Sequence, residues 1–473
     1  MKGDFTRMTF DPLRHFSRVL MQQGRVQLDA DFNEQAAILL HYMRTLATDL
    51  IGPYGGPLGG AMGFRLAEAG SGRFEIGPGR YYVDGILCEN DGEDTQSYIK
   101  LPETDGTYFA YLDVWERHLT HVQDERIREV ALGGPDTCTR AKVVWQVRLE
   151  DIGELDSDAE FDCEEAIEDL RRRERPDRRP HMLARVSDEG QGKDVCSVPP
   201  DSRYRGKENQ LYRIEVHRGG PAWDGTTDKD GTPLGNLDEA ATFKWSRDNG
   251  SVVFPIVRQQ GNVVFLESFG RDQRTSVRVG DWVEIMDDDL ELGGALGILA
   301  QVDAVDTVEM SVTLRSPAGG PLNWPEYDEE SENHPLLRRW DHRKVEGLAM
   351  DGGAILVEDG WIEIEDGVEV RFDAGSYPFR TGDCWLVPAR VATGDIEWPE
   401  DEDGSPMARP PQGVEHHYAP LGVIQKGDLH TDCRCGFRPS CQPLAQGKKP
   451  LPTDEIVLEK KKLKEAKPAD QPQ

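Results

Sequence analysis

Short runs of alternating apolar and polar residues, separated by turn-forming residues, recur through most of the chain. Leu211–His217 and Ala241–Ser246 are clear examples. Successive side chains of a β-strand point to opposite faces, so such alternation is typical of strands with one buried face. The 473 residues include 49 Gly and 30 Pro, which favours short strands joined by turns. We therefore predict a mainly β fold of several small β-sandwich or barrel modules, with an N-terminal arm and one helix.

The first 60 residues lack this alternation and predict an arm followed by a helix. Asp31 is placed to cap the helix, and Glu34 completes a capping-box pattern three residues later. Gly52 and Pro53 end the helix. Helical spacing is kept by a set of small and apolar residues: Ala36, Leu39, Leu40, Met43, Leu46, Ala47 and Leu50.

Composition and strand density divide the chain further. A short helix is expected at Glu164–Arg173, inside a strongly charged stretch, and a short helix or turn at Asp124–Leu132. The predicted parts are an arm and helix (1–60), a β module (61–150), a charged linker with a short helix (151–200), a β barrel or sandwich (201–320), a C-terminal β domain (335–445) and a disordered tail (446–473).

Two local patterns bear on how the modules are built. Asp248-Asn249-Gly250 predicts a tight turn before the next strand. Gly280-Asp281 leads into a strand with an inward Trp282, and Gly382-Asp383 leads into one with an inward Trp385. This similarity between the two segments indicates either two related barrels or one common way of beginning a strand.

The net charge of −32 disfavours binding to nucleic acid and to anionic membranes. Met1–Thr9 is polar and shows no signal peptide, and no stretch approaches the roughly 18 apolar residues of a membrane span. We therefore expect synthesis in the cytoplasm and no membrane insertion. The acidic, Arg-rich composition fits either a high-salt cytoplasm or a GC-rich genome.

One cluster has the residue types of a metal site. Cys and His are the usual ligands of a closed structural zinc site, and a Cys-x-Cys pair holds one metal less readily than Cys-x-x-Cys. Eight Cys in this length are not a disulfide framework, so most are expected to be reduced. A local disulfide formed after release from the cell, or free thiols, are the alternatives to zinc at these residues: His430, Cys433, Cys435 and Cys441.

Other candidate residues have ordinary structural explanations. His416 and His417 are adjacent on a strand and point to opposite faces, which disfavours a shared ion. The acidic runs 287–289, 328–332 and 400–403 suit solvated turns better than calcium sites. Aromatic residues could form a sugar-binding platform, although strand aromatics are more often core: Tyr81, Tyr82, Trp115, Trp245, Trp282, Trp361 and Trp385.

No nucleotide-binding loop, nucleophile elbow or His-Glu-x-x-His motif occurs in the sequence. Pairs such as Asp281 and Glu284 are too ordinary among 87 acidic residues to indicate a hydrolase. We therefore predict that the protein is not an enzyme and holds no cofactor other than the structural zinc considered above.

The opening Met1–Arg7, with Phe10-Asp11-Pro12 and Asn33-Glu34-Gln35, resembles a family of uncharacterised proteins encoded with extracellular contractile injection systems and phage-tail-like particles. The resemblance continues through residues 130–136, 208–213, 243–251, 380–390 and 416–418.

This resemblance implies a non-catalytic structural or accessory component, such as a baseplate-periphery, fibre or attachment protein. Its partners would be other particle subunits and further copies of itself, and the assembled particle is one that can be released from the cell. A carbohydrate- or surface-binding module of the particle, or a loaded effector, are the alternatives. The arm, polar yet punctuated by Phe5, Phe10, Phe16 and Leu20, suits insertion into a neighbour or into this chain's own β domains.

Overall fold

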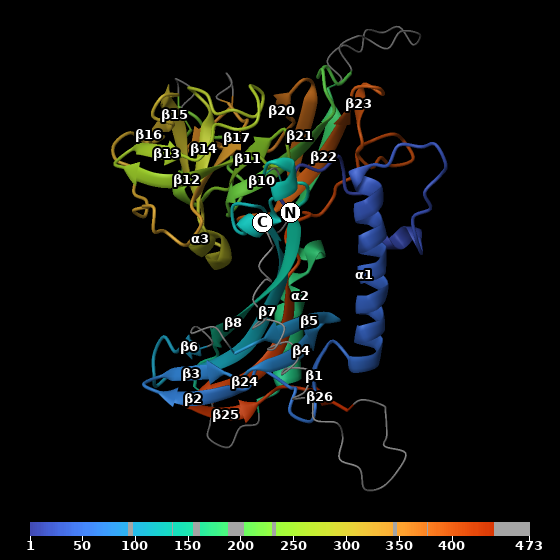
Figure 1. Cartoon of the computed structure of the whole chain (residues 1–473), viewed down its shortest axis with the longest axis vertical. Coiled ribbons are helices and arrows are strands. Elements are labelled where there is room, and N and C mark those ends of the chain that lie inside the picture. The colour runs from blue at the N-terminus through green and yellow to red at the C-terminus, as the bar shows by residue number, and fades with distance from the viewer. Residues whose placement is uncertain are drawn as a thin grey trace, which may run out of the picture. The chain divides into compact units, whose positions relative to one another are not determined.

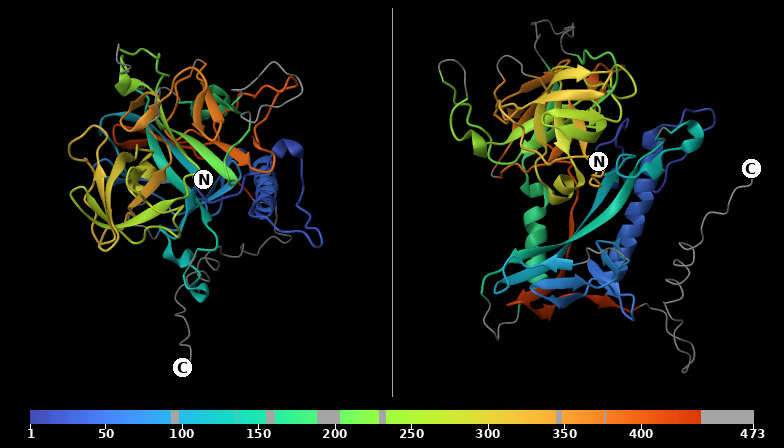
Figure 2. Two further views of the ribbon diagram at one scale, coloured as in Figure 1. Left: turned by 90° about the horizontal axis from the view of Figure 1, so that it is seen from above. Right: turned by 60° about the vertical axis from the view of Figure 1, so that its left-hand side comes forward.

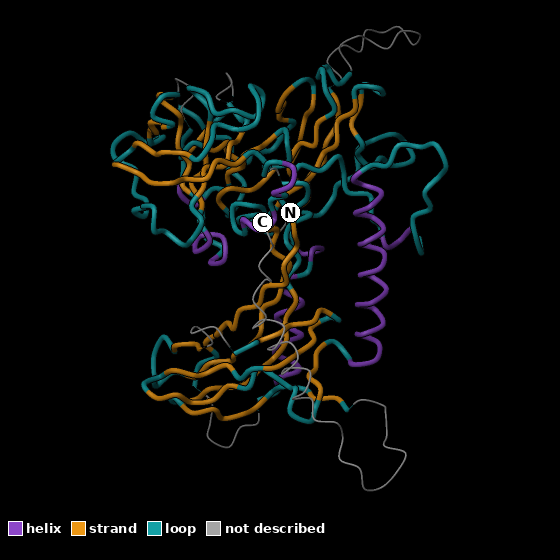
Figure 3. Tube along the Cα trace, in the orientation of Figure 1, coloured by secondary structure: helices purple, strands orange, loops and turns teal. Residues whose placement is uncertain are grey.

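The computed structural model describes residues 1–92, 98–134, 136–154, 161–187, 203–228, 233–343, 348–375 and 377–438. Strands predominate over helices among these residues, which confirms the predicted mainly β fold class (Figure 3). The chain forms two compact units. Unit 1 comprises Met1–Ile38, Arg117–Lys142 and Glu174–Glu415, and unit 2 comprises Leu39–Glu116, Val143–Arg173 and His416–Gln473.

Both units are built from separate stretches of chain, whereas the predicted modules were each continuous. Strands from the predicted parts 201–320 and 335–445 pair with each other in one sheet, and a strand of the part 61–150 pairs with one near residue 420. Alternation along a strand reveals its faces but not its partner, which is why the boundaries differ.

Helix α1 (Asp29–Ile51) begins two residues before the expected start. Asp31 therefore lies within the helix, and Glu34 accepts a hydrogen bond from the hydroxyl of Thr9 (2.7 Å) instead of capping. No helix among the described residues is long and apolar enough to span a membrane. The other helices are α2 (Cys163–Glu174), α3 (Asp288–Gly293) and the 3-10 turns η1 (Pro12–Arg14), η2 (Glu125–Ile127), η3 (Val130–Leu132), η4 (Pro176–Arg178) and η5 (Leu237–Glu239).

Unit 1 contains a six-stranded sheet and a three-stranded sheet that share one core. Buried aromatic side chains, among them Tyr212, Phe243, Phe372 and Trp385, fill the space between them. The six strands, in spatial order, are β18 (Met350–Asp351), β19 (Ala354–Leu356), β11 (Thr242–Ser246), β10 (Gln210–Arg218), β22 (Cys384–Arg390) and β23 (Asp395–Ile396). The three are β20 (Ile362–Glu365), β21 (Val368–Asp373) and β9 (His181–Val186).

Unit 1 also contains a closed six-stranded barrel with its own apolar interior (Figures 1 and 2). Closure leaves no sheet edge with unpaired backbone groups. The strands, in spatial order, are β12 (Val253–Gln260), β13 (Val263–Leu266), β16 (Ser311–Arg315), β15 (Ile298–Asp306), β14 (Trp282–Met286) and β17 (Leu336–Trp340).

The predicted turn at Asp248–Gly250 is present and connects β11 of the sheet to β12 of the barrel. Asn249 (φ 52°) and Gly250 (φ 66°) adopt the left-handed conformation that this turn requires. Trp282 begins a barrel strand, but Trp385 lies on the open six-stranded sheet. The similarity between the two Gly-Asp segments therefore reflects a common way of beginning a strand and not a second barrel.

Unit 2 is built from three small sheets around a core that includes Phe64, Tyr81 and Leu112. Pro420 sits at a register shift in β24, which is where a proline is tolerated inside a sheet. The first sheet has β26 (Gly436–Phe437), β1 (Tyr54–Pro57), β4 (Gly79–Val83) and β5 (Ile86–Asn90). The second has β2 (Leu66–Gly70), β3 (Arg73–Ile76) and β6 (Tyr98–Lys100), and the third has β25 (Asp428–Asp432), β24 (His417–Gln425), β7 (Thr107–Leu119) and β8 (Arg140–Asp151).

A disulfide joins Cys163, the first residue of α2, to Cys433, just beyond β25. Ile167 and Leu170 of the same helix pack on Phe109 and Val423 of the third sheet. The sequence predicted mostly reduced thiols and, at most, a local disulfide near residue 433. Its partner lies 270 residues away, and cysteine spacing alone does not reveal such a pairing.

We expect the substitution Cys163→Ser to lower the free energy of unfolding of unit 2 by roughly 2–4 kcal/mol, because the long loop is no longer closed in the unfolded chain. Thermal unfolding with and without reductant measures this. Reductant should bring the wild type to the level of the variant, and Cys435→Ser, at an exposed free thiol, is the control. Equal stability of all three proteins under oxidising conditions would contradict the assignment.

Candidate functional site

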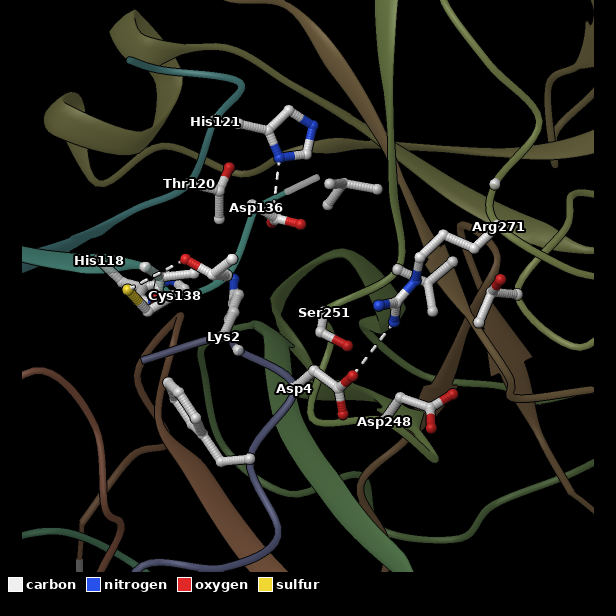
Figure 4. A pocket seen from close by; sticks show the side chains of 18 of the residues that line it. Lys2, Asp4, His118, Thr120, His121, Asp136, Cys138, Asp248, Ser251 and Arg271 are labelled. Atoms are coloured by element: carbon white, nitrogen blue, oxygen red, sulfur yellow. Dashed lines mark hydrogen bonds and ion pairs between the residues drawn. The ribbon is translucent and has the colours of Figure 1, made fainter. Parts of the chain in front are cut away.

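Several ionisable side chains in unit 1 line a cavity of about 850 Å³ (Figure 4). Four segments line it: the arm at Lys2–Phe5, the start of α1, residues 118–139 between β7 and β8, and barrel residues 248–275. Because these segments are far apart in the sequence, only the folded unit brings them together.

The arm is held at the edge of this cavity by the turn between sheet and barrel. The side-chain amide of Asn249 donates hydrogen bonds to the carbonyls of Met1 (3.2 Å) and Gly3 (2.9 Å). A side chain at Gly3 would collide with the Phe5 ring and the imidazole of His118, so glycine allows the arm to fit. The predicted insertion of the arm into the chain's own β domains is thus present for its first residues.

Two buried glutamates bind the arm, the sheet and the barrel together. Glu215 on β10 pairs with Lys2 of the arm (3.0 Å) and with Arg213 (2.6 Å). Lys244 on β11 lies 3.5 Å from Glu215 and forms a very short ion pair with Glu284 on β14 of the barrel. A buried ion pair is stable only when its remaining lone pairs and protons are also satisfied.

The indole of Trp340 on β17 supplies such a contact and donates to Glu284 (2.9 Å). The ammonium group of Lys244 also lies over the Trp340 ring, 4.5 Å from its centroid. The network is therefore both ionic and aromatic.

The electrostatics of this network follow from burial and from an excess of cations. Burial alone would raise the pKa of Glu215, but the charges of Lys2, Arg213 and Lys244 outweigh it and hold the pKa well below its usual range. In the same way Glu284, buried but close to Lys244, has its pKa lowered to about 2. Both carboxylates are ionised across the physiological pH range.

Three histidines near the network are kept neutral. Burial, reinforced by Lys244, lowers the pKa of His217 to about 3. Burial also lowers the pKa of His118 to about 4 and that of His342 to about 4. Protonating any of them would add a cation to a region where cations already exceed anions.

The polar side chains that line the cavity are joined in pairs. His118 Nε2 lies 2.8 Å from the hydroxyl of Thr139, and His121 Nδ1 lies 3.1 Å from Asp136. Cys138 is exposed, and its sulfur accepts from the guanidinium of Arg140 (3.1 Å), which lowers the pKa of the thiol.

Asp248, also on the cavity, is tied to the barrel by an ion pair with Arg274 (3.0 Å). Its Oδ2 atom has no hydrogen-bond partner among the described residues, and burial raises the pKa of the carboxyl. This oxygen is buried and lies 3.9 Å from a guanidinium nitrogen of Arg339, which marks Asp248 as part of the packed structure.

The four predicted zinc ligands do not form one group in the described part of the chain. Cys433 is bonded to Cys163, His430 is exposed on β25, and Cys435 is an exposed free thiol. Cys441 lies outside the described residues. No group of three or more potential metal ligands is present among the residues that the structure describes. A thiolate at Cys433 would require the disulfide to be reduced first.

The two adjacent histidines have separate partners, and only His417 lies on β24, which His416 directly precedes. His416 Nδ1 lies 2.6 Å from Asp113, and its ring stacks on Trp115. His417 Nδ1 lies 2.9 Å from Asp84. All of these residues belong to unit 2, and the contacts explain both histidines as structural.

The aromatic and acidic candidates also have structural roles. Five of the seven aromatics are buried, while Tyr82 is half-buried and Trp361 lies under the guanidinium of Arg185. In the run 287–289, Asp287 caps α3 and accepts from the hydroxyl of Tyr327 (2.9 Å).

Sequence reasoning missed the buried network itself. Arg213 and Glu215 alternate with apolar residues along β10, and alternation predicts that they face solvent. Both faces of that strand are buried, because the three-stranded sheet covers one and the arm and barrel cover the other. Charges of opposite sign two residues apart on one strand face were the signal available in the sequence.

Comparison with protein families gives one match, which covers most of the chain. A model of a family of unknown function, DUF6519, matches residues 1–175 and 156–455. The chain belongs to this family. No curated protein and no solved structure matches it.

We expect Glu215→Gln to lower the free energy of unfolding of unit 1 by about 3–5 kcal/mol, because it leaves buried cations without a counter-charge. The matched control is Glu363→Gln, which breaks an exposed ion pair with Arg205 and should cost at most about 1 kcal/mol. Urea unfolding monitored by tryptophan fluorescence measures both, and similar losses for the two variants would refute the structural role of the network.

As the pH is lowered, unit 1 should lose stability before the pH reaches the range in which carboxylates become protonated. The pKa values of His118, His217 and His342 are lower in the folded chain than their ordinary value of 6.5. As the pH falls below about 6.5 the unfolded chain binds protons and the folded chain does not. Stability then declines by up to roughly 1.4 kcal/mol per pH unit for each histidine.

Melting temperatures between pH 7 and about pH 4 test this expectation. The variant His217→Gln should flatten the decline, because one of the three buried imidazoles is removed. An unchanged melting temperature over this range in the wild type would contradict it.

Proposed function

We propose that this protein is a non-catalytic structural or accessory component of a contractile injection system or related phage-tail-like particle, at the baseplate periphery, in a fibre or as an attachment protein. The resemblance of its arm and strand motifs to proteins encoded with such particles suggests the context. The exposed part of the arm supports the proposal.

The observation that carries the proposal is the exposed apolar surface of the arm. Beyond the residues anchored by Asn249, the arm exposes apolar side chains instead of burying them. Leu13 and Val26 are more than four-fifths exposed, and Phe16, Leu20 and Met21 are also exposed. Exposed apolar side chains gathered in one segment are suited to contact with another protein. A particle subunit needs such a segment to reach its neighbours.

Two further observations support this function over catalysis. The basic and acidic side chains around the cavity are paired with one another, as structural groups are. The disulfide between Cys163 and Cys433 suits a protein that leaves the cytoplasm, since disulfides persist in oxidising surroundings. We propose synthesis in the cytoplasm followed by assembly into a particle that is released.

The test is to purify particles from the source organism and determine by mass spectrometry whether the chain is present at fixed copy number. We expect the double variant Leu20→Glu, Val26→Glu to be lost from the particles, because it places charges in the apolar contact. The control Val308→Glu, at a fully solvated turn of the barrel, should be retained.

Absence of the wild-type chain from purified particles would overturn the proposal. Retention of the double variant at wild-type copy number would remove the arm from the assembly surface.

A further inference from the structure

Helix α1 carries an apolar stripe that faces solvent. Its members follow one another in alternating steps of four and three residues, which is the heptad spacing of a coiled-coil seam. All are exposed, and the five larger ones each expose 53–77 % of their surface. We call this set the heptad stripe: Phe32, Ala36, Leu39, Met43, Leu46 and Leu50.

The opposite side of the helix is fixed to the protein. Ile38 is buried. In unit 2, Arg44 pairs with Glu116 (3.0 Å), and a Cβ atom on Gly85 would lie 2.3 Å from the carbonyl oxygen of Arg44. Such close approach of helix and turn sets the rotation of α1 about its axis. The heptad stripe is therefore held outward by packing on the other face.

The heptad stripe is large enough for a specific contact. Its side chains, with Leu40 beside them, expose roughly 600 Å² on one chain, so pairing two such stripes would bury about 1,200 Å², the lower limit for a specific interface. A contact of this size is expected to dissociate on dilution.

The residues that flank the stripe carry little charge. The positions that flank a coiled-coil seam are here Asn33, Leu40 and Ala47 on one side and Gln35, Tyr42 and Asp49 on the other. Asp49 is the single charged residue among them. Two chains that each carry a net charge of −32 can thus meet along α1 with little repulsion at the contact.

We propose that the heptad stripe pairs with the same stripe of a second copy of this chain, with the two helices antiparallel. This inference rests on the proposed function as an assembly protein and names one partner of it. The contact is isologous, so a single two-fold axis relates the copies and the assembly closes as a dimer.

The antiparallel direction follows from side-chain size and charge. It sets Phe32 against Leu50 of the second copy, Ala36 against Leu46, and Leu39 against Met43, so the small residue meets a large one. A parallel pair would set Ala36 against itself and leave a gap, which a packed seam disfavours.

The acidic residues at the start of the helix also favour the antiparallel direction. A parallel pair would also bring together the acidic residues that begin both helices, namely Asp29, Asp31 and Glu34. The antiparallel pair separates them by the length of the helix.

Sedimentation analysis of the purified full-length protein over a range of concentrations tests the pairing. The wild type should approach twice 53.0 kDa at high concentration and 53.0 kDa on dilution. Met43→Glu should remain at the mass of one chain throughout, while Val308→Glu, an equal change of charge at an exposed turn, should behave as wild type. Circular dichroism verifies that each variant is folded.

A wild type that stays at the mass of one chain at every concentration, or a Met43→Glu variant that still pairs, would overturn the inference. If the wild type did not pair but were nevertheless present in purified particles, the proposed function would stand and only the identity of the partner would be wrong. If the protein pairs but is absent from particles, the proposed function fails and the pairing stands.

Cross-linking tests the direction in chains whose exposed Cys138 and Cys435, together with Cys196 and Cys441, are replaced by Ser. An antiparallel pair predicts that a chain with Leu39→Cys forms disulfides with a Met43→Cys chain faster than with itself. Faster self-linking of Leu39→Cys would overturn the antiparallel arrangement.

Discussion

The ion network around Glu215 and Glu284 is the interaction on which unit 1 depends. It joins three parts of the unit: the arm, the six-stranded sheet and the barrel. The contact between sheet and barrel combines an apolar cluster, which includes Trp340 and Ala354, with these buried charges. A slipped strand would leave a buried ion without its partner. The network thus selects a geometry that apolar packing alone would leave loosely specified.

Much of the local structure could be predicted from the sequence, and little of its long-range pairing. The expected helix at Glu164–Arg173 lies within α2, and the alternating stretch Leu211–His217 lies within β10. These elements follow from nearby residues, through periodicity and turn chemistry. The pairing of β10 with β22 and the bond between Cys163 and Cys433 depend on residues far apart in the chain, and no local pattern encodes them.

The candidate site shows the same division. The separate partners of His416 and His417 followed from their adjacency in the sequence. The importance of Arg213 and Glu215 did not, because alternation distinguishes two faces of a strand but not whether the second face is covered. For the cluster near residue 433, the residue types suggested a metal, whereas the folded chain gives one of those sulfurs a covalent partner from a distant helix.

The anchoring of the arm has a consequence for the order of events during synthesis. Lys2 contacts Glu215, Thr6 accepts a hydrogen bond from Arg390, and Arg7 pairs with Glu397. Because the ribosome makes the arm long before these partners, the arm is still unattached while most of the chain emerges. The contacts of the arm are thus complete only after residue 397 has been made. A chain truncated before residue 215 would lack all three partners and leave the arm unattached.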